Sequence, residues 1–275
     1  MLASFSAEML KLYKRLATWI LILVPLVLNQ VFSYLVPYTS YLSAENERAA
    51  EQVLANRLPA DLVLNSIGGF PVFAGAIALT LGALSVGSEY GWGTLKTTLI
   101  QRPRRLKVYA GKLLALAVVV LTIVLATFVL GVFSSSAIAL SQSEVMDWPS
   151  LADLTQGIAS GWLILMMWCL FGVMLAFVFR GTALPIGLGV VWIMGIENLI
   201  VNVAAPLLDF AETLQKGLPS VNAGSLVSAL NGGEVGSAPG VNTTVDGTQA
   251  TLVLIAYAVV FVLIAGFVLQ RRDVT

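Results

Sequence analysis

The sequence predicts an all-α membrane protein with six transmembrane helices, and three observations favour this fold class. Of its 275 residues, 58% are hydrophobic and only 11% are charged, whereas a soluble domain carries about 25% charged residues. Six apolar runs are each long enough to cross the hydrocarbon core, which takes about 20 residues of helix. The basic residues gather in alternate connections between these runs, as expected for a membrane protein with a defined topology.

Missing residue types exclude several kinds of site. The chain has no histidine and one cysteine, Cys169, so an intrachain disulfide and a histidine-based metal or acid–base site are both excluded. We expect Cys169, which lies within an apolar run, to be a small buried or lipid-facing residue. We expect no metal site and no catalytic residue in this chain.

The first predicted element is an amphipathic helix that lies in the membrane interface ahead of the first span. Apolar residues recur at helical spacing over residues 2–16, while Glu8, Lys11 and Arg15 lie on the other faces, a pattern typical of interfacial helices. The alternative is that these residues form only the first turns of the first span. The stretch after Arg15 is uncharged until Glu45, so we expect a retained span rather than a cleaved signal peptide.

The six predicted spans form one transmembrane domain that covers residues 1–275. We expect them at residues 17–38, 64–88, 110–138, 156–179, 182–204 and 249–269. The longest connection is an outer loop over residues 205–248. Its first half is semi-apolar and predicts short helices that rest on the outer interface, and its second half is rich in turn residues.

The distribution of charge predicts the topology. With the N-terminus inside, twelve of the fifteen Lys and Arg residues fall on the cytoplasmic side, and only Arg48, Arg57 and Lys216 fall outside. Connections rich in Lys and Arg stay in the cytoplasm. We therefore expect a multi-pass protein of the cell membrane, of bacterial origin, with both termini in the cytoplasm.

The polar segment between the second and third spans, residues 87–112, is named the bridge here. After Glu89 it contains six Lys or Arg residues and no further carboxylate. A turn with two glycines precedes a helical pattern over residues 94–100, which Pro103 ends because proline has no amide donor and disfavours helix in the residue before it. The bridge is either a docking segment for a cytosolic partner or a basic loop that only obeys the charge rule.

This segment resembles the one that follows the second helix in ABC-2-type permeases, the membrane subunits of one class of ATP-driven exporters. The matching features are Glu89, the Gly93-Thr94-Leu95 turn, Leu99, Pro103 with Arg105, and the Gly111-Lys112 pair that opens the third helix. The resemblance implies ABC-2 (type V exporter-like) architecture, with a coupling segment at residues 89–108 that docks on a separate ATPase subunit. The residues it implies for coupling are Glu89, Gly91, Gly93, Thr94, Leu95, Thr98, Leu99, Pro103 and Arg105.

The same resemblance implies the partners. They are an ATPase subunit that carries ATP and Mg²⁺, and a second permease copy or a similar permease that completes a dimeric pathway in the bilayer. The implied substrate is an amphipathic drug, peptide or lipid, and no nucleic acid is involved. The sequence contains no P-loop, because Gly111-Lys112 is followed by Leu113 and lacks the leading glycine. We therefore expect no ATP hydrolysis, enzymatic activity or cofactor in this chain alone.

Polar residues within the spans are the candidates for a transport pathway. Glu197 is the carboxylate that interrupts the fifth apolar run, and a charge at mid-bilayer costs about 2.5–3.5 kcal/mol on insertion scales. Glu197 is either a pathway residue or a residue near the outer interface. The candidate pathway residues are Glu197, Asn198, Asn202, Asn29 and Gln30.

Two other functions remain open. The alternative to an exporter subunit is a secondary transporter or channel that is not coupled to an ATPase, although charged residues for ion coupling are scarce in the spans. An intramembrane enzyme is the weakest reading, because the chain lacks histidine, clustered acids and a serine paired with a base.

Overall fold

The computed structural model describes residues 2–43, 46–95, 97, 105–233 and 238–271. Over these residues the regular structure is entirely helical, which confirms the all-α prediction. Six helical stretches are long and apolar enough to cross a membrane, which is compatible with a multi-pass membrane protein. These six stretches are Leu16–Leu42, Pro59–Gly91, Arg105–Gln142, Leu151–Phe179, Ala183–Ala204 and Gly247–Arg271.

Three of the spans are composite and three are single helices. The first consists of α2 (Leu16–Gln30), the π-helix η1 (Val31–Leu35) and α3 (Val36–Leu42). The second consists of η2 (Pro59–Asp61), α5 (Leu62–Ile67), the π-helix η3 (Phe70–Ala74) and α6 (Gly75–Gly91). The fifth consists of α10 (Ala183–Val191), η4 (Trp192–Ile196), α11 (Glu197–Leu199) and η5 (Ile200–Ala204). The single helices are α8 (Arg105–Gln142), α9 (Leu151–Phe179) and α14 (Gly247–Arg271).

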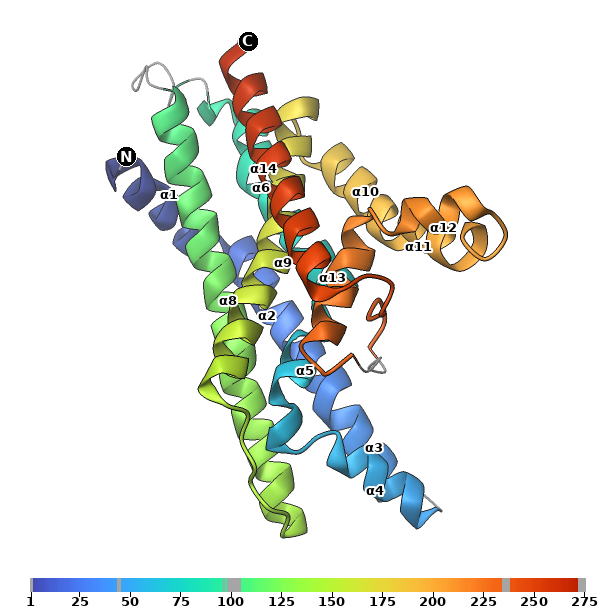
Figure 1. Ribbon diagram of the computed structural model, residues 1–275. Coiled ribbons are helices and arrows are strands. Elements are labelled where there is room, and N and C mark those ends of the chain that lie inside the picture. The colour runs from blue at the N-terminus through green and yellow to red at the C-terminus, as the bar shows by residue number, and fades with distance from the viewer. Residues whose placement is uncertain (1, 44–45, 96, 98–104, 234–237, 272–275) are drawn as a thin grey trace.

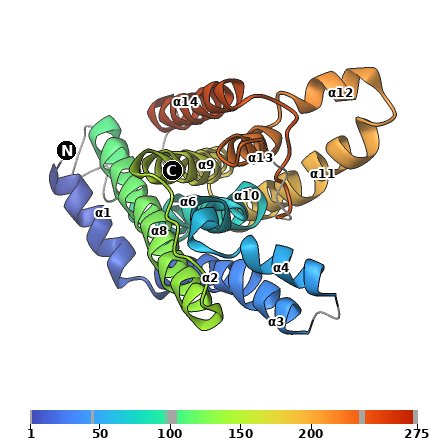
Figure 2. The same ribbon diagram turned by 60° about the horizontal axis from the view of Figure 1, so that its bottom comes forward.

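Shorter helices lie outside the spans. They are α1 (Leu2–Lys14), α4 (Glu47–Ala55), α12 (Asp209–Gln215) and α13 (Pro219–Ala229). Both described ends of the chain lie at the same end of the bundle as the end of α6 and the start of α8 (Figure 1). We call this the bridge end. The opposite end, with α3, α4 and the connection from α8 to α9, is called the loop end, while α11 and α12 lie to one side of the bundle (Figure 2).

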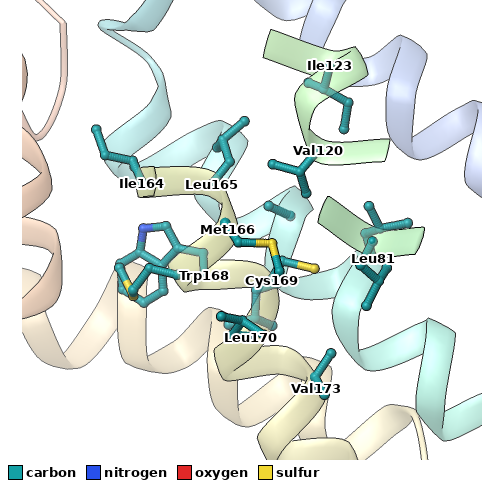
Figure 3. Packing of buried hydrophobic residues seen from close by; sticks show 14 of the residues in the cluster. Leu81, Val120, Ile123, Ile164, Leu165, Met166, Trp168, Cys169, Leu170 and Val173 are labelled. Atoms are coloured by element: carbon teal, nitrogen blue, oxygen red, sulfur yellow. The ribbon is translucent and has the colours of Figure 1, made fainter. Parts of the chain in front are cut away.

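The centre of the bundle is a close pair of helices, α6 and α9. A methyl group on Gly82 would overlap the carbonyl oxygen of Cys169, and one on Gly172 would overlap that of Leu79, so these glycines let the two backbones touch. Around this contact, side chains of α9 meet those of α6 and α8 (Figure 3). Cys169 is fully buried there, and so the buried interpretation of this residue is right and the lipid-facing one is wrong.

The N-terminal helix is separate from the first span, as predicted, because the backbone of Arg15 is extended (φ −89°, ψ 121°). The side chains of α1 divide between the bundle and the surface. Its buried residues are Ser4, Glu8 and Leu12, whereas Leu2 is 81% exposed. The helix turns Glu8 and part of its apolar stripe, Leu12, toward the bundle, and Glu8 pairs there with Lys112 of α8.

The segment predicted as an outer loop contains a buried helix. Residues 219–228 of α13 are buried, and this helix packs against α14 and η3. The expectation that helices in this part rest on the outer interface is wrong for α13. Small residues allow its deep insertion, since a methyl group on Gly224 would overlap the carbonyl oxygen of Gly240.

Candidate functional site: a buried charge cluster at the base of the bridge

Four charged side chains from three helices meet at the bridge end, and we call them the charge cluster. Glu8 and Lys11 come from α1, Glu89 from the last turns of α6, and Lys112 from the first turns of α8. The Lys112 ammonium group lies 2.5 Å from Glu8 Oε2 and 3.0 Å from Glu89 Oε1. The Lys11 ammonium group lies 2.6 Å from Glu8 Oε1 and 2.8 Å from Glu89 Oε1. Each acid therefore contacts both bases.

The charge cluster is shielded from solvent and has no net charge. Glu8, Glu89 and Lys112 are 5%, 2% and 3% exposed, while the side chain of Lys11 is 33% exposed. Lys112 also donates to the carbonyl oxygen of Ser85, at 3.2 Å. Burying an ion is tolerated only when opposite charges and hydrogen bonds replace its water, and this arrangement meets that requirement.

The ionisation of the α1 pair follows from the same contacts. Burial tends to raise the pKa of Glu8, but the charges and hydrogen bonds of Lys112 and Lys11 outweigh burial and lower the pKa below its usual value. Burial tends to lower the pKa of Lys11, but hydrogen bonds and charges from Glu8 and Glu89 raise the pKa overall. Both shifts favour the charged forms, so the cluster is held together by ion pairs.

Local sequence explains why these residues can meet. Glu8 and Lys11 are three residues apart, which places them on one face of α1. Gly111 lets this face approach α8, because a methyl group at Gly111 would lie 2.7 Å from the Ser4 Cβ atom. Lys112, the next residue, then reaches between the two acids.

The turn that begins the bridge lies directly after the charge cluster. The helix α6 ends at Gly91, and Gly93 has a φ of 65°, a left-handed conformation that favours glycine. Beyond this turn, Thr94 is exposed on helical backbone and Leu95 is only 2% exposed. The described part of the turn thus presents a polar residue beside an anchored apolar one.

Other contacts fix both ends of the bridge. Near its start, the Arg15 guanidinium group donates to Ser88 Oγ at 2.9 Å and lies 4.8 Å from the ring centre of Trp92. A methyl group on Gly87 would overlap the carbonyl oxygen of Gly181 in the turn between α9 and α10. At the far end, Arg105 donates to the carbonyl oxygens of Leu269 and Gln270 on α14, at 3.1 and 3.3 Å.

The structure places the residues predicted for coupling in three groups. Glu89 lies within the charge cluster, and Arg105 ties the bridge to α14. Gly91, Gly93, Thr94 and Leu95 form the turn. Thr98, Leu99 and Pro103 lie outside the described residues. The sequence analysis missed Glu8, Lys11 and Lys112 as partners of Glu89. The sequence did contain a signal for these partners. Glu8 lies three residues before Lys11 in α1, and the bridge also begins with an acid, Glu89.

The predicted pathway residue Glu197, on α11, is buried away from solvent. It is 1% exposed, and its Oε2 atom accepts hydrogen bonds from the Ser220 hydroxyl group and from the Ser220 amide at 2.8 Å. Ser220 is in the first turn of α13, where free amides and the helix dipole favour a negative group. These contacts give Glu197 a structural role that neither earlier interpretation, a pathway residue or a residue near the outer interface, had included. Glu197 caps the start of α13.

The other predicted pathway residues make contacts elsewhere. Asn29 donates to the carbonyl oxygens of Asn65 and Ser66, at 2.9 and 3.2 Å, and so joins the first span to the second. Gln30 accepts from Ser134 of α8. Asn198 and Asn202 are exposed and hydrogen-bond each other. The five candidates therefore do not share one hydrogen-bonded group.

Residues 60–275 match the family described as "Protein of unknown function (DUF2705)". A search of curated proteins gives no match. The matched region contains Glu89 and Lys112 of the charge cluster, whereas Glu8 and Lys11 precede it. In the described part of the chain, no group of three or more acidic or cysteine side chains could hold a metal ion.

Proposed function

This chain belongs to the DUF2705 family, and we propose that it is the membrane permease subunit of an ATP-driven ABC-2 exporter. In this proposal the bridge end faces the cytoplasm of a bacterial cell, and an ATPase subunit with its ATP and Mg²⁺ docks on the bridge. The observation that carries the proposal is the charge cluster, because it ties the base of the bridge to three helices at once.

The physical reasoning concerns how motion would pass from a motor to the spans. A loop that is attached flexibly absorbs displacement, whereas one fixed by buried ion pairs moves with its anchors. Removing one partner from a buried pair costs about 3–5 kcal/mol, so the cluster resists separation of α1, α6 and α8. A force applied to the bridge would shift these three helices together, and the Arg105 contact would carry the shift to α14.

The uneven burial of the spans supports a second permease copy or a similar permease as a partner. In the most apolar window of the first and fifth spans, only 17% and 22% of residues are buried, against 67% in the second and fourth. Large apolar side chains of the first span, including Phe32 and Leu35, are 66% and 57% exposed. Such surfaces face lipid or a neighbouring protein, and a dimer would place the pathway between two chains. The proposed substrate is amphipathic.

The test is to purify the tagged chain from its native membrane and to measure the ATP hydrolysis that accompanies it. We expect a P-loop ATPase to co-purify with the wild type. Gly93→Pro should abolish this association, because proline cannot adopt a φ near 65°. Glu89→Gln should retain the ATPase but reduce hydrolysis in reconstituted vesicles at least about tenfold, the equivalent of about 1.4 kcal/mol.

The matched control is Glu144→Gln, which neutralises an exposed acid at the loop end and should leave association and hydrolysis unchanged. The proposal fails if the wild-type chain carries no ATPase, or if Gly93→Pro and Glu89→Gln behave as Glu144→Gln does. Transport that persists without any ATPase would instead support the secondary transporter or channel.

A further inference from the structure

We propose that a cavity near the loop end, between the first and second spans, binds an anionic amphiphile with a single acyl chain. Arg57 would hold its carboxylate or phosphate headgroup, and the apolar walls of the cavity would receive the chain. This inference concerns binding alone and does not depend on the proposed coupling to an ATPase.

The cavity has the size and lining of a site for a small ligand. Its volume is about 370 Å³, toward the lower end of the roughly 300–1,000 Å³ that such pockets have. Apolar side chains line it from both spans, including Phe32 of η1 and Phe70 and Phe73 of η3. The polar lining residues are joined to one another by hydrogen bonds, and they are Asn29, Ser33, Asn65 and Arg57. This combination of a joined polar group with apolar walls fits an amphiphile.

Arg57 supplies a cation with unused hydrogen-bonding capacity. One terminal nitrogen donates to Asn65 Oδ1, but the Nε atom is buried and has no partner. The salt bridges within 4.0 Å among the described residues do not include Arg57. Asp61 acts on Arg57 electrostatically from further away. A guanidinium group binds carboxylates and phosphates through pairs of N–H groups, and Arg57 is the charged residue in the lining of this cavity.

Two further buried donors near this region also lack partners. They are the hydroxyl groups of Tyr34 in η1 and Ser66 in α5. Both lie against Gly131, since a methyl group there would be 3.1 Å from each hydroxyl oxygen. Three of the five unpartnered buried side-chain atoms among the described residues therefore belong to η1, α5 and the segment just before the second span. Tyr34 and Ser66 are not among the residues that line the cavity, so their hydroxyl groups lie outside the proposed site.

The depth of the residues matches the shape of an amphiphile. Arg57 precedes the second span, which begins at Pro59, whereas Phe70 and Phe73 lie within it. An anion at Arg57 would sit where lipid headgroups lie, and a chain along the phenylalanines would run into the hydrocarbon core. Phe32 and Phe73 are 66% and 46% exposed, so the apolar part of the cavity opens toward the bilayer.

The test is a binding titration of the purified full chain in nanodiscs of neutral phospholipid, with bound probe counted by native mass spectrometry. The probes are oleate, oleoyl lysophosphatidate and, as the neutral comparison, monoolein. We expect the wild type to bind at least one acidic probe about tenfold or more tightly than monoolein. The reason is that monoolein cannot make the charged hydrogen bond that Arg57 would donate to an acidic headgroup. The relative affinity of the two acids identifies the headgroup as a carboxylate or a phosphate.

Three variants assign the effect to the cavity. Arg57→Gln should remove the preference for the acidic probe, and Arg57→Lys should retain part of it. Gly69→Leu should weaken binding of all probes, because Gly69 lines the cavity and an added side chain meets open space. Arg48→Gln is the matched control, since Arg48 is an exposed cation on α4, and it should bind as the wild type does.

Several results would overturn the proposal. They are equal affinity of the wild type for acidic and neutral probes, no saturable binding of any probe, or an unchanged preference in Arg57→Gln. If Arg57→Gln does not yield folded protein, Arg57→Lys and Gly69→Leu decide: wild-type affinities in both would contradict the site. Binding of acidic probes that Arg48→Gln removes equally would point to surface charge instead.

Discussion

Glu89 and Glu197 are both almost fully buried carboxylates, but the chain stabilises them in different ways. Glu89 is 2% exposed and contacts two ammonium groups that come from other helices. Glu197 is 1% exposed and accepts hydrogen bonds from the amide and hydroxyl groups of one serine at a helix start. Full opposite charges surround the first acid, whereas partial charges of the backbone and a hydroxyl surround the second.

The difference shows what each acid holds together. The charge cluster joins α6 and α8 to α1, which is far from both in the sequence, and so its loss would free the base of the bridge. The Glu197 contact joins the fifth span to α13 only, and α13 is also held by its packing against α14. We therefore expect substitutions in the charge cluster to have larger effects than substitutions around Glu197.

The largest effect is expected for Lys112→Met, which replaces a buried cation with an uncharged side chain of similar length. Glu8 and Glu89 would then share Lys11 alone, and the cluster would bury a net negative charge. Breaking a buried ion pair in this way costs about 3–5 kcal/mol, which should appear as a lower unfolding midpoint in detergent. Lys107→Met, at an exposed position on the same helix, should change the midpoint little. Equal midpoints for the two variants would contradict the importance of burial at Lys112.

A smaller loss is expected for Ser220→Ala. This substitution removes the hydroxyl donor to Glu197 and keeps the amide donor. A hydrogen bond to a charged group contributes about 1.5–3 kcal/mol, so the free energy of unfolding should fall by about 2 kcal/mol. The control is Thr213→Ala, because Thr213 is an exposed residue of α12. A loss as large as that of Lys112→Met would contradict the larger effect expected for the charge cluster.

The helices and the bridge could be predicted from the sequence because their signals are local. Runs of apolar residues define the spans, and the Gly93 turn follows from glycine spacing and Pro103. The structure extends most spans beyond the predicted bounds, as in α8, which begins at Arg105 and ends at Gln142. Charged residues at helix ends are compatible with helix, but they interrupt the apolar runs from which the bounds were read.

The partners of the candidate residues could not be predicted, because they depend on contacts between distant parts of the chain. Glu89 was selected from the bridge alone, yet Glu8 is 81 positions away and meets it through Lys11 and Lys112. Similarly, the capping of α13 by Glu197 required the insertion of a segment that composition placed in a loop. Amphipathic periodicity indicated α1 but not which of its faces would be buried.

The most direct test of the central claim is a double-mutant cycle on Glu89 and Lys112, with the free energy of unfolding measured for the wild type, Glu89→Gln, Lys112→Met and the double variant. If the cluster fixes the bridge through this ion pair, the double variant should be more stable than the sum of the single losses predicts. Contacting charged residues give interaction energies of about 0.5–3 kcal/mol, and we expect a value above about 1 kcal/mol. The claim would be contradicted if the loss in free energy of unfolding of the double variant equalled the sum of the losses of the two single variants.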